Sequence, residues 1–308
     1  MSQPSGTGGQ GPRRTPITLA IYRDLRVAMV VLMVMLAAGV IIEKISAPCW
    51  QSAISTYYYT SAHSIVIAAL LALGTLFIIY RGSSDTEDVL LTLAGVSALT
   101  AAMVPQDRPS DLCSGPANLP PDFNTQAAAL PNVRAVAIAL GLGYAVIWSV
   151  MLVQCLRGHR PQARRPVGIV SLCVFWLIMA VGLIALLFFR DKFLKYAHGA
   201  AAVLLLSAFI ATTFCTAYVV GREDPSKSPH QRCYKRIYWG IAWLMLATLI
   251  AVVSVHLVHP RWLGVLWGLV AEVALILEFA AYWVVQTIDL WKTPDRSGRL
   301  PKGPPGFL

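Results

Sequence analysis

Residues 167–189 read VGIVSLCVFWLIMAVGLIALLFF, and no Lys, Arg, Asp or Glu interrupts them. A helix needs about 20 apolar residues to cross the hydrocarbon core of a bilayer, so this stretch predicts a transmembrane helix. Charged residues make up 13% of the 308-residue chain, whereas a soluble domain typically carries about 25%. The chain is therefore expected to be an integral membrane protein.

Seven further apolar stretches lie on either side of this one. The expected fold class is an all-α, polytopic membrane protein, a bundle of eight transmembrane helices that forms one domain over residues 17–292. The tails, residues 1–16 and 293–308, are rich in Gly, Ser and Pro and are expected to be disordered. The expected spans lie at about 25–43, 64–80, 86–104, 134–155, 167–189, 196–220, 237–259 and 263–288.

The distribution of positive charge predicts the orientation. The chain has 25 Lys and Arg residues and a formal net charge of +10. With both termini in the cytoplasm, 18 of these residues fall on the inner side and 7 on the outer side. Such an excess is the positive-inside pattern of membrane proteins. Because the basic residues lie in short loops beside apolar stretches, they indicate membrane orientation and argue against nucleic-acid binding.

The span at 86–104 is the shortest in apolar length. Ser84 and Glu87 predict a capping box at its start. Ala94, Ala98 and Ala102 recur every fourth residue, which is typical of close helix packing in lipid. After it, six prolines between residues 105 and 132 predict an extended or turned outer loop.

Two of the six cysteines, Cys49 and Cys113, fall in segments expected outside the membrane. An oxidising exterior permits a disulfide between them, which would join the loop after the first span to the loop after the third. The alternative is a pair of unlinked thiols. No Cys-x-x-Cys pair is present, so the sequence does not indicate a zinc ribbon or a thioredoxin-like site.

Four of the six histidines fall at span ends on the expected outer side. His63 begins the second span, His198 begins the sixth, and His256 and His259 end the seventh. Glu272 lies nine residues inside the last span, roughly 14 Å into the membrane. Ionisable groups at such depth usually face the bundle interior and serve a function.

These residues predict a polar pocket near the extracytoplasmic face. Its candidate residues are His63, His198, His256, His259 and Glu272. His63, His198 and His256 could bind zinc, and two histidines on different helices could instead hold haem. The alternative is that the histidines are scattered residues that form hydrogen bonds at the membrane interface.

Two parts of the sequence resemble a known family. Residues 54–60 read ISTYYYT, and Glu272 is followed by Phe279 and Trp283. Both patterns are similar to the Ser-Ile-Ser-x-Tyr-Tyr-Tyr-Thr and Glu-x6-Phe-x3-Trp motifs of bacterial multi-pass membrane proteins known as a domain of unknown function. The resemblance covers about a third of the chain and departs from the family at Gln286, where a Lys is common. It implies a bacterial plasma-membrane location and no particular activity.

The sequence favours an integral membrane protein that binds a lipid, a small amphiphile or a partner protein through this pocket. The first alternative is a metal-dependent hydrolase acting on a lipid. It is an analogy with the alkaline-ceramidase group, whose His-x-x-x-His pair is absent here. The second alternative is a haem-binding electron-transfer protein.

Overall fold

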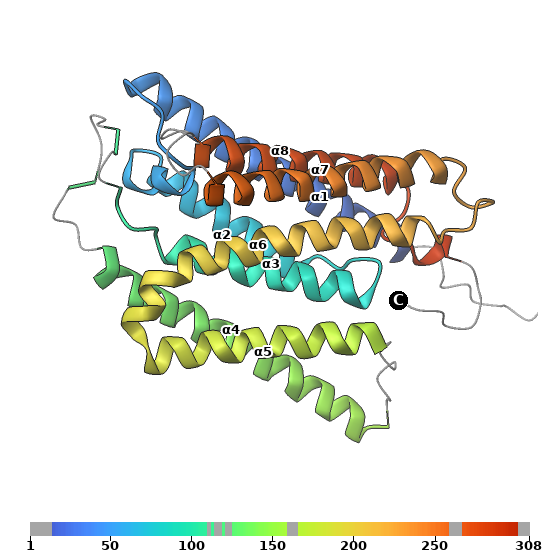
Figure 1. Cartoon of the computed structure of the whole chain (residues 1–308). Helices are drawn as coiled ribbons and strands as arrows, with labels where there is room; N and C mark the ends of the chain where they lie inside the picture. Colours follow the sequence, from blue (N-terminus) through green and yellow to red (C-terminus); the bar gives the residue numbers. More distant parts are fainter. Residues whose placement is uncertain are drawn as a thin grey trace, which may run out of the picture.

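The computed structural model describes residues 14–109, 112–113, 119–120, 125–158, 166–258 and 267–300. Eight α-helices and two short 3-10 helices make up most of this part of the chain, and no strand occurs in it (Figure 1). In chain order they are α1 (Arg14–Ser46), η1 (Ser55–Tyr59), α2 (His63–Ile79), α3 (Asp85–Met103), α4 (Thr125–Leu156), α5 (Pro166–Phe188), α6 (Arg190–Val220), α7 (Gln231–Val258), α8 (Trp267–Asp289) and η2 (Ser297–Arg299).

Seven of the helices are long and apolar enough to cross a membrane, and α2 is a shorter apolar helix of 17 residues. The exposed surface of the long helices carries many large apolar side chains, among them Leu142, Trp148 and Leu177. A soluble protein rarely exposes so large a continuous apolar surface. The all-helical, multi-pass membrane fold predicted from the sequence is therefore confirmed.

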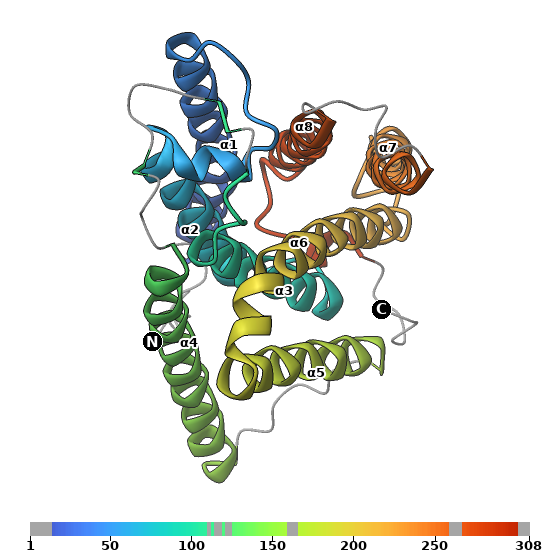
Figure 2. The same ribbon diagram turned by 60° about the vertical axis from the view of Figure 1, so that its left-hand side comes forward.

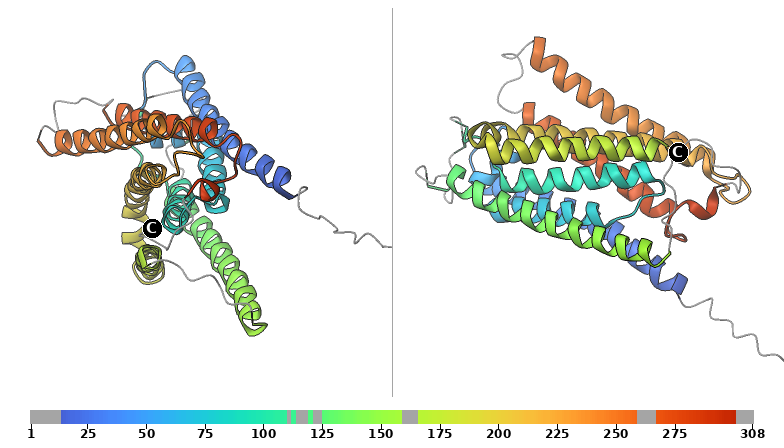
Figure 3. Two further views of the ribbon diagram at one scale, coloured as in Figure 1. Left: turned by 90° about the vertical axis from the view of Figure 1, so that its right-hand side faces the viewer. Right: turned by 90° about the horizontal axis from the view of Figure 1, so that it is seen from below.

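The helices α2, α3 and α6 form the centre of the bundle, as the contacts between them and the views in Figures 1 and 2 show. On one side of this centre lie α1, α8 and α7, and on the other lie α4 and α5. Figures 2 and 3 show that α4 diverges from the other helices over most of its length. Most of its residues are accordingly exposed, which leaves its apolar side chains to the lipid.

Local sequence explains how tightly α2 and α3 pack. A Cβ atom on Gly74 would lie 2.8 Å from the carbonyl oxygen of Gly95, so only glycine permits this backbone approach. The side chains of Ala94, Ala98 and Ala102 are buried, as their spacing predicts. The hydroxyl of Ser84 accepts the N–H of Glu87 at 3.2 Å, as the predicted capping box requires, but the Glu87 carboxylate accepts the N–H of Ser83 and not that of Ser84.

The structure corrects the prediction for the outer loop. The loop was expected to continue to residue 132, but α4 begins at Thr125 and contains Pro131. Pro131 is the seventh residue of α4, so it removes one N–H group from the helical hydrogen bonds without ending the helix. The proline count therefore overestimated the length of the loop.

The predicted tails are also corrected. Helix α1 already begins at Arg14, and residues 293–300, expected to be disordered, return to the bundle. The side chain of Arg296 in this segment is fully buried. The composition of this segment predicted disorder, but ion pairs and hydrogen bonds hold it in an ordered structure.

Successive helices alternate between two ends of the bundle. We call the end that carries Cys49, η1, Cys113 and the start of α8 the disulfide end. We call the opposite end, with Tyr80, Glu223, Asp289 and Arg296, the arginine end.

Candidate functional site

A cavity of about 150 Å³ lies inside the bundle toward the disulfide end. It occupies the space between α8 and the central helices, because α8 packs closely against α1 and α7 but has few contacts with α6. Its walls come from α1, α2, α3, α6, α8 and η1, and nearly all of the lining side chains are apolar. The sequence predicted a polar pocket here. The structure instead has an apolar cavity with polar groups at one end.

Three phenylalanines form the deep end of the cavity. The rings of Phe209 and Phe279 stack with centroids 3.6 Å apart, and the edge of Phe77 contacts both rings. On α6 the cavity extends from His198 to Phe209, which is about 16 Å along the helix axis. A volume of about 150 Å³ is enough for a benzene ring, so the space admits the end part of one hydrocarbon chain.

Four polar residues lie at the other end, which we call the mouth. They are Ser55, Tyr58, His198 and Glu272. The Tyr58 ring comes from η1, which covers this end of the helices, and the other apolar contacts there include Ile54 and Pro105.

Glu272 connects α8 to η1. Its Oε2 accepts the backbone N–H of Ile54 at 2.6 Å, and the N–H of Ser55 also donates to the carboxyl group. Close by, the N–H of Leu269 donates to the carbonyl of Ser52 at 2.7 Å. The carboxylate therefore positions the start of η1 over the cavity, and it lines the cavity as well.

His198 connects α6 to the end of α3. Its Nδ1 lies 2.8 Å from the carbonyl oxygen of Val104, so Nδ1 carries the hydrogen and donates it. The ring also lines the cavity. The structure thus brings together two of the predicted pocket residues, His198 and Glu272.

Of the other three predicted histidines, only His63 has a described side chain, and it does not line the cavity. His63 donates from Nδ1 to the carbonyl of Tyr58 at 2.5 Å, and its ring contacts the Tyr58 ring with centroids 4.3 Å apart. It therefore supports a residue of the mouth from outside. The side chain of His256 and the whole of His259 lie outside the described residues.

Among residues whose side chains are described, no group of three or more His, Cys, Asp or Glu side chains is arranged to hold a metal ion. His63 and His198 each use Nδ1 for a backbone carbonyl. The zinc set proposed from the sequence, His63, His198 and His256, and the haem alternative have no support from these contacts.

The segment after α3 covers the disulfide end. Cys49 and Cys113 form a disulfide with Cα atoms 5.8 Å apart. Gln51 makes two hydrogen bonds to the backbone of Cys113, at 3.2 and 3.1 Å. The hydroxyl of Tyr59 donates to the carbonyl of Gln106 at 2.5 Å. These bonds hold the loop against η1.

The three tyrosines of η1 are shielded from water. Burial raises the pKa of the Tyr57, Tyr58 and Tyr59 phenols above the ordinary value of 10.0. Neutral phenols are therefore favoured beside the mouth.

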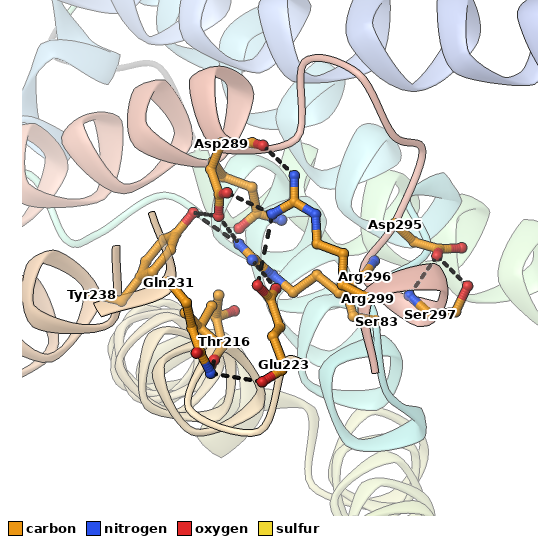
Figure 4. Close-up of polar contacts among 12 residues, drawn as sticks. Ser83, Thr216, Glu223, Gln231, Tyr238, Asp289, Asp295, Arg296, Ser297 and Arg299 are labelled. Atoms are coloured by element: carbon orange, nitrogen blue, oxygen red, sulfur yellow. Dashed lines mark hydrogen bonds and ion pairs between the residues drawn. The ribbon is translucent and has the colours of Figure 1, made fainter. Parts of the chain in front are cut away.

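The arginine end contains a buried ionic cluster that the sequence did not predict (Figure 4). Arg296 contacts Glu223 at 2.7 Å and Asp289 at 2.6 Å, and it donates to the hydroxyl of Tyr238 at 3.0 Å. Arg299 contacts Asp289 at 2.8 Å. Burial opposes the charge of Arg296, but Tyr238, Asp289 and Glu223 outweigh burial and raise its pKa.

Arg26 extends this cluster to α1. Its guanidinium donates to the hydroxyl of Tyr80 at 3.0 Å and to the carbonyls of Leu290 and Pro294. Gln286 donates to the same tyrosine hydroxyl at 3.1 Å. In the sequence these arginines indicated only the orientation of the helices, and their role in the cluster was not predicted. The available signal was the pair Asp289 and Arg296, which lie seven residues apart just after the last span.

Two further carboxyl groups have partners between helices. Glu87 accepts the hydroxyl of Thr216 at 2.7 Å and the N–H of Ser83 at 2.6 Å. Glu278, expected to need a partner away from the face of Glu272, accepts the hydroxyl of Thr248 on α7 at 2.7 Å. Neither residue lines the cavity.

Comparison of the chain with family models, with curated proteins and with solved structures found no match. A function for this protein is therefore inferred from the cavity and its mouth.

Proposed function

We propose that this protein is a bacterial plasma-membrane protein of the multi-pass family suggested by its motifs, and that it binds a lipid or small amphiphile in the cavity. The hydrocarbon chain lies between α8 and the central helices, and the polar head lies at the mouth. The observation that supports this is the apolar cavity described above, which extends about 16 Å along α6 and has its polar groups gathered at one end.

The proposed topology has eight membrane-spanning helices with both termini in the cytoplasm. The disulfide end then faces the extracytoplasmic side, where the Cys49–Cys113 bond is stable against reduction. The excess of Lys and Arg on the opposite side supports the same orientation. The mouth opens toward the outer leaflet in this arrangement.

An apolar ligand gains about 0.8 kcal/mol for each methylene that it buries. The described side-chain contacts of Ser55, His198 and Glu272 go to Gln106 or to backbone groups, which supports a binding role for the cavity. The alternative of a partner protein needs an exposed binding surface, whereas this space lies inside the bundle.

The test is to fill the cavity. Ala202 lines it on α6, and Ala202→Leu adds three carbon atoms. The affinity for a fluorescent single-chain amphiphile is expected to fall roughly fifty-fold, which corresponds to about 2.4 kcal/mol of lost burial. Binding is measured in detergent micelles or nanodiscs by competition.

The matched control is Ala139→Leu on the exposed face of α4. It makes the same change outside the cavity and is expected to bind as the unmodified protein does. Thermal unfolding of both variants shows that they are folded, and Ala202→Val gives a graded intermediate. Unchanged binding by the folded Ala202→Leu protein would exclude the cavity as the binding site.

A further inference from the structure

The mouth of the cavity has an uneven charge. Glu272 is the only Asp or Glu among its described lining residues, and no Lys or Arg lines it. Two basic residues of the same end have other partners. Arg108 donates to the carbonyls of Leu119 and Pro120, and Lys44 donates to the carbonyl of Ala47. No described cation therefore lines the cavity where a bound head group would lie.

The polar atoms at the mouth include hydrogen-bond acceptors on Glu272 and Ser55, together with the hydroxyl of Tyr58, which can also donate. The Glu272 carboxyl group receives N–H groups from η1 and keeps further acceptor capacity, because a carboxylate has about four lone-pair positions. His198 donates to the backbone carbonyl of Val104 at 2.8 Å and also hydrogen-bonds to the backbone of Ala101. The hydroxyl of Ser55 already donates to Gln106 at 2.7 Å.

The Glu272 carboxyl group in its apolar surroundings should distinguish anionic, cationic and uncharged head groups. A carboxylate or phosphate head would bring a second negative charge near Glu272 in a medium of low dielectric constant, where charges interact strongly. An ammonium head would instead supply hydrogen-bond donors and the opposite charge. A hydroxyl head supplies one donor and no charge, so it should be intermediate.

On the basis of the proposed function, we infer that the ligand is a single-chain amphiphile with a cationic amine head, and that Glu272 selects this head over an anionic one. The chain enters the apolar cavity between α8 and α6, and the ammonium group donates to Glu272 at the mouth. Anionic lipids and fatty acids are excluded from this site although their chains would fit.

The experiment compares three probes that share one hydrocarbon chain and differ in the head: dodecylamine, dodecanol and dodecanoate. Each competes with the fluorescent amphiphile for the protein in nanodiscs of zwitterionic lipid, so that surface charge does not concentrate one probe. The expected order of affinity is amine, alcohol, carboxylate. We expect at least a tenfold difference between the amine and the carboxylate, or about 1.4 kcal/mol.

Glu272→Gln keeps an oxygen that can accept the N–H of Ile54 but removes the charge. In this variant the preference for the amine is expected to fall to within about threefold, while the alcohol binds nearly as before. The matched control is Glu278→Gln in the same helix, whose carboxyl group contacts Thr248 and does not line the cavity. It is expected to leave the order and the differences unchanged.

The outcomes separate the two proposals. If no probe binds, or if Ala202→Leu binds all three as the unmodified protein does, the proposed function is wrong. If the probes bind through the cavity but with equal affinity, or with the carboxylate preferred, only the head-group inference is wrong. If Glu278→Gln lowers the preference as much as Glu272→Gln does, the selection does not arise at the mouth and the inference is also overturned.

Discussion

Carboxylates at the two ends of the bundle have different partners. At the arginine end, Glu223 and Asp289 contact the guanidinium groups of Arg296 and Arg299, and all four side chains are largely buried. At the disulfide end, the contacts described for Glu272 come from backbone N–H groups of η1, with no cation among them. One end pairs its charges within the protein, and at the other end the Glu272 carboxyl group lines the cavity.

This difference indicates which end is built for stability and which for binding. A buried charge is tolerated when an opposite charge and hydrogen bonds compensate its lost hydration. The cluster at the arginine end meets this condition, because its carboxylates contact buried guanidinium groups. At the mouth, the described contacts of Glu272 come only from neutral N–H donors. A cationic ligand could therefore add an opposite charge beside this carboxyl group.

The largest expected effect comes from breaking the cluster. Arg296→Ala leaves Glu223 and Asp289 buried with less compensation, and the expected loss of stability is about 3–5 kcal/mol. Thermal or denaturant unfolding in detergent measures it. Arg222→Ala, on the exposed surface of the same loop as Glu223, should change stability by no more than about 0.5 kcal/mol. Equal losses in the two variants would contradict the structural role of Arg296.

The second test acts on the opposite end. The disulfide closes a sequence separation of 64 residues, for which the chain-entropy model gives an upper bound of about 4 kcal/mol. Because transmembrane helices restrict the unfolded chain, we expect the double variant Cys49→Ser, Cys113→Ser to lose about 2 kcal/mol. Cys173→Ser, which changes an exposed thiol, is the control.

The same double variant also distinguishes the two ends locally. Hydrogen exchange should accelerate in residues 105–109 and 112–113, while residues 290–299 keep their protection. If protection is lost equally at both ends, then the disulfide stabilises the whole bundle and the two ends are not independently stabilised.

A smaller effect is expected from alkaline pH. Burial raises the pKa of Tyr57, Tyr58 and Tyr59 in the folded protein above 10.0. The buried neutral phenols therefore stabilise the folded protein fully below pH 10. This stabilisation is lost as the pH rises through the raised pKa values of the folded protein. Tyrosinate absorbance should show phenols that titrate late, and Tyr57→Phe should remove one of them. Titration of all tyrosines near pH 10 would contradict the burial of η1.

The smallest effect concerns an exposed ion pair. Arg81 lies 3.6 Å from Asp88, and its side chain is 62% exposed. Exposed pairs contribute about 0–1 kcal/mol, so Arg81→Ala should shift stability by less than about 0.5 kcal/mol. The same unfolding assay measures it. A loss comparable to that of Arg296→Ala would show that burial does not set the strength of the ionic contacts.

The long apolar helices, and part of the candidate site, could be predicted from the sequence. Long apolar stretches such as residues 167–189 fold as helices because lipid requires their backbone groups to bond internally. The depth of Glu272 and the position of His198 suggested a shared polar pocket, and both residues line one largely apolar cavity. The apolar character of that cavity was not predictable, because it depends on how far α8 lies from α6 rather than on any local pattern.

The ionic cluster could not be derived from the same patterns. Composition marks residues 293–300 as a tail, since Pro, Gly and Ser surround Arg296. The carboxylates that order this segment lie in other parts of the chain, Glu223 after α6 and Asp289 at the end of α8. Only the three-dimensional arrangement reveals that they meet.

The position of Arg296 in the chain has a consequence for biosynthesis. Glu223 is inserted with the sixth helix, yet the arginine that neutralises it is translated more than seventy residues later. The buried ion pair of Glu223 therefore cannot form until residue 296 has been translated.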